Sequence, residues 1–115
     1  MKDKELDDEW GHDPSVQSQR RVFARMEAHQ KELLERLRLS PLDERLGRIR
    51  DLARGHFEKA WPVARRKGVI DKEEGMARLY IHCLIRILEW ERIQVPEEAF
   101  LRDPKLVRFL NENLR

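Results

Sequence analysis

Cationic residues concentrated between residues 20 and 67 could bind a polyanion. This stretch contains 14 lysines and arginines but 7 acidic residues, whereas the whole chain has a formal net charge of only +2. Arginine suits phosphate contacts, and attraction to a phosphate backbone requires no recognition of bases. We expect the fold to gather six of these cations at one end of the molecule, as a candidate nucleic-acid-binding site called the basic cluster: Arg20, Arg21, Arg25, Arg65, Arg66 and Lys67.

The same charges could instead form a solvated helix face. Side chains four apart on a helix lie close enough to form ion pairs. Pairs of opposite charge at this spacing in the stretch include Glu27 and Lys31, Glu32 and Arg36, Glu44 and Arg48, and Arg54 and Glu58. Aromatic residues that could stack on bases are few, and they fall on or near apolar faces. Binding of an RNA or DNA backbone is therefore the alternative function, and not the preferred one.

An arginine and a histidine have a spacing found in one class of nucleases. Asp51 follows Arg50 directly, and His56 lies six residues after Arg50. This spacing resembles that of HEPN-type ribonucleases, which are helical and often dimeric. The resemblance covers seven of the 115 residues and implies RNA cleavage that depends on His56. Residues six apart on a straight helix point about 120° apart, so the pair would converge only through a bend at Gly55 or a second subunit.

A polar stripe crosses the most apolar part of the chain. Arg78, His82 and Arg86 recur at intervals of four within residues 75–90, so they share one face of a helix. The positive charge of both arginines would disfavour the protonated form of His82. We expect this polar stripe to meet solvent or the acidic residues of a partner, and an anion held by both arginines is the alternative.

The sequence lacks the motifs that usually identify an enzyme. It contains no glycine-rich phosphate loop, no CxxC and no HExxH. Its three serines each stand near an expected helix start and suggest no catalytic triad. Glu9 and His12 have the spacing of metal ligands but no further ligands beside them, and Cys83 in the apolar run is typical of a buried, inert thiol. We therefore predict a non-enzymatic protein with no metal, no cofactor and no small-molecule substrate.

The apolar run at residues 75–90 must organise the fold. Apolar side chains cover nearly its whole circumference, so other helices or a second subunit must bury it. Asp71 and Glu74 have the spacing of a capping box and Pro96 follows the end, which predicts a helix over residues 71–92. Two arginines, a histidine and a glutamate interrupt the run, which is too short for the roughly 20 apolar residues of a membrane span.

Two further long helices are expected before this central one. The first spans residues 15–39, and a short turn at Ser40 starts the second, which ends before Gly68. The short connection makes the two an antiparallel hairpin, with residues 20–25 opposite residues 55–60. The buried face of the second helix is expected to consist of Leu42, Leu46, Ile49, Ala53, Phe57, Ala60 and Ala64.

The two ends of the chain differ in character. Residues 96–101 and 103–114 are expected to form short helical segments, and the second should bury Leu106, Val107, Leu110 and Leu114. Residues 1–14 carry six acidic residues and two lysines, which predicts a disordered acidic tail. The whole pattern predicts an all-α fold, a single-domain helical bundle of three long helices plus one or two short C-terminal helices, over residues 15–115.

The preferred function is that of an accessory or assembly subunit acting through protein–protein helix-face contacts. The helix at residues 71–92 has more apolar surface than its short neighbours would easily cover, so we expect a protein partner or self-association. The alternative is a nucleic-acid backbone-binding subunit of a ribonucleoprotein or DNA complex that uses the basic cluster. A single cysteine and the absence of an apolar signal segment lead us to expect a cytoplasmic location without membrane contact.

Overall fold

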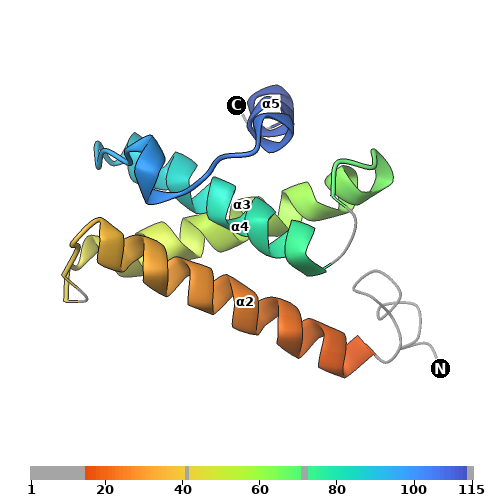
Figure 1. Ribbon diagram of the computed structural model, residues 1–115, viewed down its shortest axis with the longest axis horizontal. Helices are drawn as coiled ribbons and strands as arrows, with labels where there is room; N and C mark the ends of the chain where they lie inside the picture. The colour runs from red at the N-terminus through yellow and green to blue at the C-terminus, as the bar shows by residue number, and fades with distance from the viewer. Residues whose placement is uncertain (1–14, 41, 71–72, 114–115) are drawn as a thin grey trace.

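All regular elements in the described part of the chain are helices (Figure 1). The computed structural model describes residues 15–40, 42–70 and 73–113, so the predicted acidic tail at residues 1–14 lies outside the described residues. In chain order the elements are α2 (Ser15–Arg36), α3 (Arg45–Arg66), α4 (Glu73–Trp90), the 3-10 helix η1 (Glu97–Ala99) and α5 (Pro104–Asn113). The all-α prediction is therefore confirmed.

The helix α4 forms the centre of the core. α2 and α3 each pack mainly on α4 and only weakly on each other, and α5 contacts both α3 and α4 (Figure 1). Every apolar side chain of α4 from Met76 to Leu88 is at most 4% exposed, and only Trp90, at the end, is exposed at 53%. The chain's own helices thus cover α4, which removes the need for a second subunit to bury it. None of the helices in the described ranges combines the length and apolar character of a membrane span.

The three long helices end in the same backbone motif. Arg38, Gly68 and Arg92 follow the helix ends with φ angles of 58°, 73° and 65°. The residue after each of them donates its N–H back to the helix in the Schellman pattern, in the bonds Leu39 to Leu34 O (3.1 Å), Val69 to Ala64 O (2.9 Å) and Ile93 to Leu88 O (2.9 Å). Glycine is the usual residue at this left-handed position, because a residue with a Cβ atom, such as arginine, has a higher conformational free energy there. Only the helix end at Gly68 was therefore predictable from the sequence.

The start of α3 differs from the prediction. Ser40 Oγ accepts the N–H of Leu42 (3.1 Å), and Asp43 Oδ1 accepts the N–H of Arg45 (2.9 Å). Such side-chain bonds to the backbone two residues ahead compete with helix formation, and α3 begins only at Arg45. Leu42 is consequently 88% exposed, so its predicted place on the buried face is wrong. The remaining predicted residues of that face are buried: Leu46, Ile49, Ala53, Phe57, Ala60 and Ala64.

The C-terminal part of the chain closes the core over α4. Asp103 caps α5 by accepting the N–H of Lys105 at its Oδ1 (2.9 Å), as expected for a residue placed just before Pro104. Leu106 and Leu110 are buried as predicted, but Val107 is 36% exposed, so its predicted burial is wrong. The buried stripe of α5 runs through Phe109 instead, because that residue lies on the same face as Leu106. The predicted burial of Leu114 lies outside the described residues.

Candidate functional site

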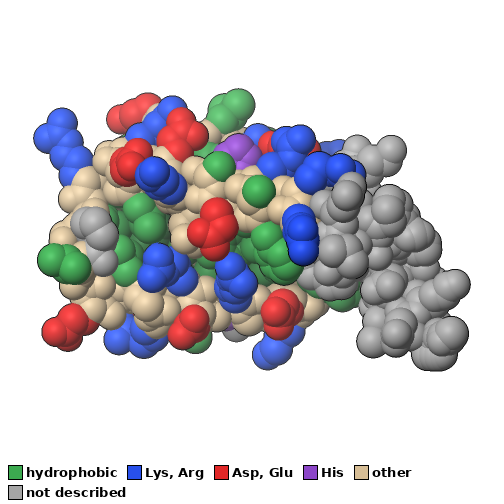
Figure 2. Space-filling view, turned by 90° about the horizontal axis from the view of Figure 1, so that it is seen from below, with side chains coloured by type: hydrophobic (Ala, Val, Ile, Leu, Met, Phe, Trp, Pro, Cys, Tyr) green, Lys and Arg blue, Asp and Glu red, His purple; other side chains and the backbone are tan. Residues whose placement is uncertain are grey.

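A groove lies between α2 and α3. Because both helices pack on α4 and only weakly on each other, they leave a channel of about 510 Å³ between them. We call it the α2–α3 groove; its lining residues are Glu27, Ala28, Gln30, Lys31, Leu34, Glu35, Leu39, Leu46 and Arg50. Figure 2 shows apolar side chains between charged ones at the end of the molecule where α2 ends and α3 begins. The volume falls in the range of binding sites in proteins.

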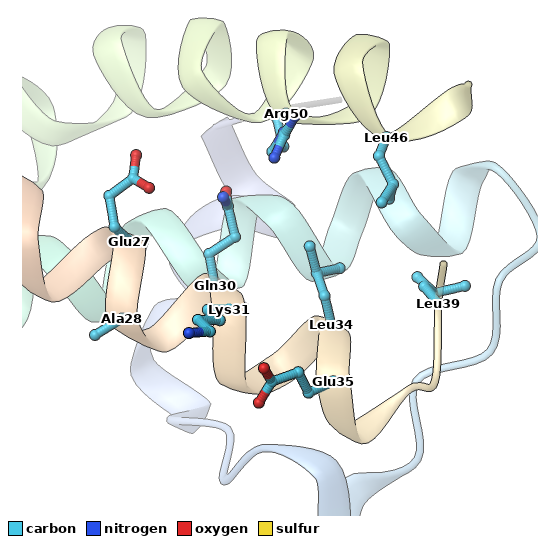
Figure 3. Close-up of a pocket in the computed structure, with 9 residues that line it drawn as sticks. All are labelled: Glu27, Ala28, Gln30, Lys31, Leu34, Glu35, Leu39, Leu46 and Arg50. Carbon is cyan, nitrogen blue, oxygen red and sulfur yellow. The ribbon is translucent and has the colours of Figure 1, made fainter. Parts of the chain in front are cut away.

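The lining of the α2–α3 groove is apolar at one end and polar at the other (Figure 3). Gln30 and Leu34 point from α2 toward α3, while Arg50 and Leu46 point from α3 toward α2. The two residues of each pair stand four apart, about 6 Å along a helix. Leu34, Leu46 and Leu39 therefore form the apolar end, and Gln30 and Arg50 form the polar end one helical turn away.

A hydrogen-bonded pair forms the floor of the polar end. The hydroxyl of Tyr80, on α4, donates to Oε1 of Gln30, and both side chains are buried. Burial raises the pKa of Tyr80, although the neighbouring Arg54 opposes this shift, so the phenol stays protonated and acts as the donor. Within the described residues, the side-chain amide nitrogen of Gln30 makes no hydrogen bond. A buried Gln30 amide therefore remains able to donate into the groove.

Ion pairs across helices replace most of the predicted pairs along them. Arg36 contacts Glu32 at 2.5 Å, as predicted. Glu27, however, pairs with Arg54 of α3 at 3.3 Å, and Arg54 also lies 5.7 Å from the ring centre of Phe23. These contacts place α2 and α3 in nearly the predicted antiparallel register. Arg50 and Lys31 are exposed cations that line the groove, and neither forms an ion pair within the described residues.

The residues of the basic cluster lie at one end of the molecule, as the helix directions required. α2 begins and α3 ends at the same end, with the start of α4 between them (Figure 1). All six side chains are exposed. Arg25 forms a 2.7 Å ion pair with Glu74 of α4, so part of its charge is already neutralised. Arg21 and Arg65 also make interactions of their own.

The polar stripe of α4 contacts the C-terminal segment of the same chain. Arg78 donates to the carbonyl oxygen of Leu101 (3.2 Å), and Arg86 donates to Oδ1 of Asn111 (2.8 Å). His82 is only 4% exposed. All three side chains proposed for contact with a partner thus make hydrogen bonds within the chain, and His82 is also buried.

The buried His82 joins two elements of the chain. Its Nδ1–H donates to the carbonyl oxygen of Arg78 (2.7 Å), and its Nε2 accepts the backbone N–H of Asp103 (2.9 Å). Its ring also makes an edge contact with Phe100, at 5.6 Å between ring centres. Burial lowers the pKa of His82, and the charges of Arg78 and Arg102 act in the same direction. This histidine is therefore a neutral structural link between α4 and the start of α5.

The structure separates the two residues of the nuclease-like spacing. α3 is one continuous helix through Gly55. Arg50 lines the α2–α3 groove, while the ring of His56 contacts Trp90 of α4 at 5.4 Å between ring centres. Burial, with help from nearby cations, lowers the pKa of His56. Arg50 and His56 therefore lie in different environments within one chain. A nuclease site that uses both residues would still require a second subunit.

Cysteine and metal chemistry find no support in the described part of the chain. Cys83 is fully buried, and burial raises its pKa to about 12, so its thiolate is not accessible. Within the described ranges, no group of three His, Cys, Asp or Glu residues is placed to hold a metal ion. The spacing of Glu9 and His12 lies outside the described residues.

Sequence reasoning did not identify the α2–α3 groove. One signal was available: Gln30 is a polar residue at a position of the apolar seam of α2, where a buried polar side chain needs a partner. That partner, Tyr80, lies 50 residues away in the chain. Leu34 and Leu46 looked like ordinary core residues, and only the divergence of α2 from α3 brings Leu34 to a half-open position.

Comparisons with known proteins identify no relative. The chain matches no family model, no curated protein and no solved structure.

Proposed function

We propose that this protein is a non-enzymatic accessory or assembly subunit that binds a helix of a partner protein in the α2–α3 groove. The observation that supports this proposal is the groove itself, an open channel with leucines at one end and a charged rim. Grooves of this kind bind the apolar face of an amphipathic helix. The original reason for expecting a partner, an uncovered α4, no longer applies, because the chain itself buries α4.

The lining residues favour a macromolecular ligand over a small molecule. Ala28, Lys31, Glu35 and Arg50 line the groove but are exposed. A ligand in contact with them would extend beyond the channel along the outer surface of both helices. A small-molecule site would instead enclose most of its ligand.

Photo-crosslinking in the cells that produce the protein tests this proposal. A photoreactive residue at Glu35, on the rim of the groove, should give a discrete crosslinked species. The same residue at Glu112, exposed on α5, should not. Leu34→Asp should abolish the crosslink because it places a charge in the apolar end, whereas Leu42→Asp, at an 88% exposed position, should preserve it. Equal crosslinking from Glu35 and Glu112, or a crosslink that survives Leu34→Asp in a folded protein, would refute the proposal.

A second candidate function is binding of a nucleic-acid backbone at the basic cluster. The observation in its favour is that the start of α2 and the end of α3 lie at one end of the molecule (Figure 1). The exposed Arg20, Arg66 and Lys67 are the residues best placed for it, because Arg25 is paired with Glu74. Arginine and lysine contacts with phosphates release counterions, so the affinity would fall steeply as salt rises.

Fluorescence anisotropy with a labelled single-stranded RNA and a labelled double-stranded DNA tests this candidate. The full-length protein should bind both at low salt, and Arg66→Glu should weaken binding by about tenfold, a loss of about 1.4 kcal/mol. Arg108→Glu, exposed on α5, is the matched control and should have a smaller effect. No binding at low salt, or an equal loss for the two variants, would exclude a backbone-binding site at the basic cluster.

A further inference from the structure

We propose that the α2–α3 groove selects an acidic amphipathic helix, in which apolar side chains and a carboxylate stand one helical turn apart. This inference rests on the proposed function and specifies the chemistry of the partner. The apolar side chains would contact Leu34, Leu39 and Leu46, and the carboxylate would lie between Arg50 and Gln30.

The spacing of the groove residues supports a helical ligand. Gln30 and Leu34 stand one turn apart on α2, and Arg50 and Leu46 stand one turn apart on α3. A ligand helix lying in the groove repeats its side chains at the same interval of about 6 Å. An acid followed by an apolar residue at three or four positions would therefore match the polar and the apolar ends together.

The charge of the surrounding helices supports an acidic ligand. Residues 20–67, which contain α2 and α3 from Arg20 onward, carry 14 cations and 7 acids. Of the two acids on the groove lining, Glu27 is already paired with Arg54. Arg50 is exposed and points into the groove, where a carboxylate can accept two parallel hydrogen bonds from its guanidinium group.

The buried Gln30 gives the polar end a second donor. This residue is 7% exposed, and Tyr80 holds its Oε1 through a hydrogen bond. This bond fixes the orientation of the amide group, and the Gln30 side chain, which lines the groove, extends from α2 toward α3 (Figure 3). A bound carboxylate oxygen would satisfy it, whereas a bound lysine, which has no acceptor, would leave it without a partner.

Two synthetic peptides test the inference. Each has about 18 residues, enough to form a helix with a flanking cap, and carries leucines at intervals of three and four. One has glutamates beside the leucine stripe, and the other has lysines at the same positions. Binding of both to the full-length protein would be measured by calorimetry. The side-chain amide resonances of Gln30 would be followed by NMR. We expect the acidic peptide to bind at least tenfold more tightly and to shift the Gln30 amide signals.

Charge reversal inside and outside the groove provides the control. Arg50→Glu should lower the affinity for the acidic peptide at least tenfold and should raise the affinity for the lysine peptide. Arg66→Glu makes the same charge change at the other end of the molecule and should lower the affinity for the acidic peptide less than threefold. Equal affinities of the two peptides, or equal losses for the two variants, would overturn the inference and indicate general polyanion attraction. A dimer of the free protein that dissociates on Leu34→Asp would also overturn it, because the occupant would then be a second copy.

The outcomes separate this inference from the proposed function. If crosslinking at Glu35 captures a partner but the acidic peptide is not preferred, the groove binds a protein of different chemistry and only the inference fails. If crosslinking also fails at Glu35, the groove is not a binding site and both fail.

Discussion

The Leu84→Glu protein is expected not to fold. Leu84 lies in the middle of α4 and is 0% exposed. A carboxylate at this position loses several kcal/mol of hydration, and protonation relieves only part of that cost because the group remains polar in an apolar site. The loss of leucine packing adds about 2 to 5 kcal/mol. Small domains are stable by about 5 to 15 kcal/mol, so the sum removes most or all of the stability.

Circular dichroism and sedimentation would measure this effect. Leu101→Glu is the matched control, because Leu101 is 80% exposed and the same substitution there removes almost no buried surface. The control should melt within a few degrees of the natural protein, while Leu84→Glu should lack a cooperative transition. A Leu84→Glu protein that stays folded but changes its state of association would contradict this account, because it would place α4 in an interface between subunits.

Acid is expected to destabilise the protein through His82. In the unfolded chain this histidine binds a proton near its ordinary pKa of 6.5, whereas burial lowers its pKa in the folded state. Below that pH the unfolded state therefore binds more protons, and stability falls as pH falls. Above pH 6.5 the contribution of the neutral His82 to the stability of the folded state is fully present. The maximum loss is about 1.4 kcal/mol for each pH unit below 6.5, or about 2 kcal/mol near pH 5.

The groups around His82 explain why it stays neutral. Its Nε2 accepts the N–H of Asp103, so a proton on Nε2 would oppose a donor already in place. The charges of Arg78 and Arg102 further disfavour the imidazolium, while the Asp103 carboxylate and the Arg78 carbonyl favour it without reversing the shift. Phe100 covers one side of the ring with an apolar surface. Protonation would therefore weaken the link between α4 and α5.

Urea denaturation near pH 7 and near pH 5 would measure this dependence. His82→Gln keeps an acceptor for the Asp103 N–H but does not titrate, so it should lose at least about 1 kcal/mol less stability over this range than the natural protein. The pKa of His56 is also lowered, so His56 could contribute to the loss of stability at low pH. The His56→Gln variant is therefore the comparison that separates the contribution of His82 from that of His56. If His82→Gln and the natural protein lose the same stability between the two pH values, His82 is not the acid-sensitive group.

The groove and the His82 link lie on different parts of the molecule and serve different purposes. The link attaches the C-terminal segment to α4 through the hydrogen bond that the buried His82 accepts from the N–H of Asp103. The α2–α3 groove has exposed cations and, on the largely buried Gln30, an amide nitrogen that makes no hydrogen bond within the described residues. A site whose donors are already bonded resists a ligand, while a site with free donors favours one. This contrast moves the expected partner contact from the polar stripe to the α2–α3 groove.

The polar stripe illustrates a limit of sequence periodicity. The spacing of Arg78, His82 and Arg86 predicts a shared helix face, and the structure agrees. Periodicity gives no information about what lies against that face. The loop between the 3-10 helix and α5 supplies the carbonyl oxygen of Leu101 and the backbone N–H of Asp103, and α5 supplies the side-chain oxygen of Asn111. The partners of Arg78 and His82 in this loop are backbone groups, which leave no mark in the sequence.

By itself, the sequence determined the helices, the burial of α4 and the direction in which α2 and α3 run. These features depend on local propensity and on the 3.6-residue repeat, which involve residues close together in the chain. Only the tertiary structure decided that α2 and α3 separate over α4, that Tyr80 holds Gln30, and that Arg50 and Leu46 line a channel. The physical reason is that a groove forms from the angle between packed helices and from contacts across long stretches of chain. No single segment contains that information.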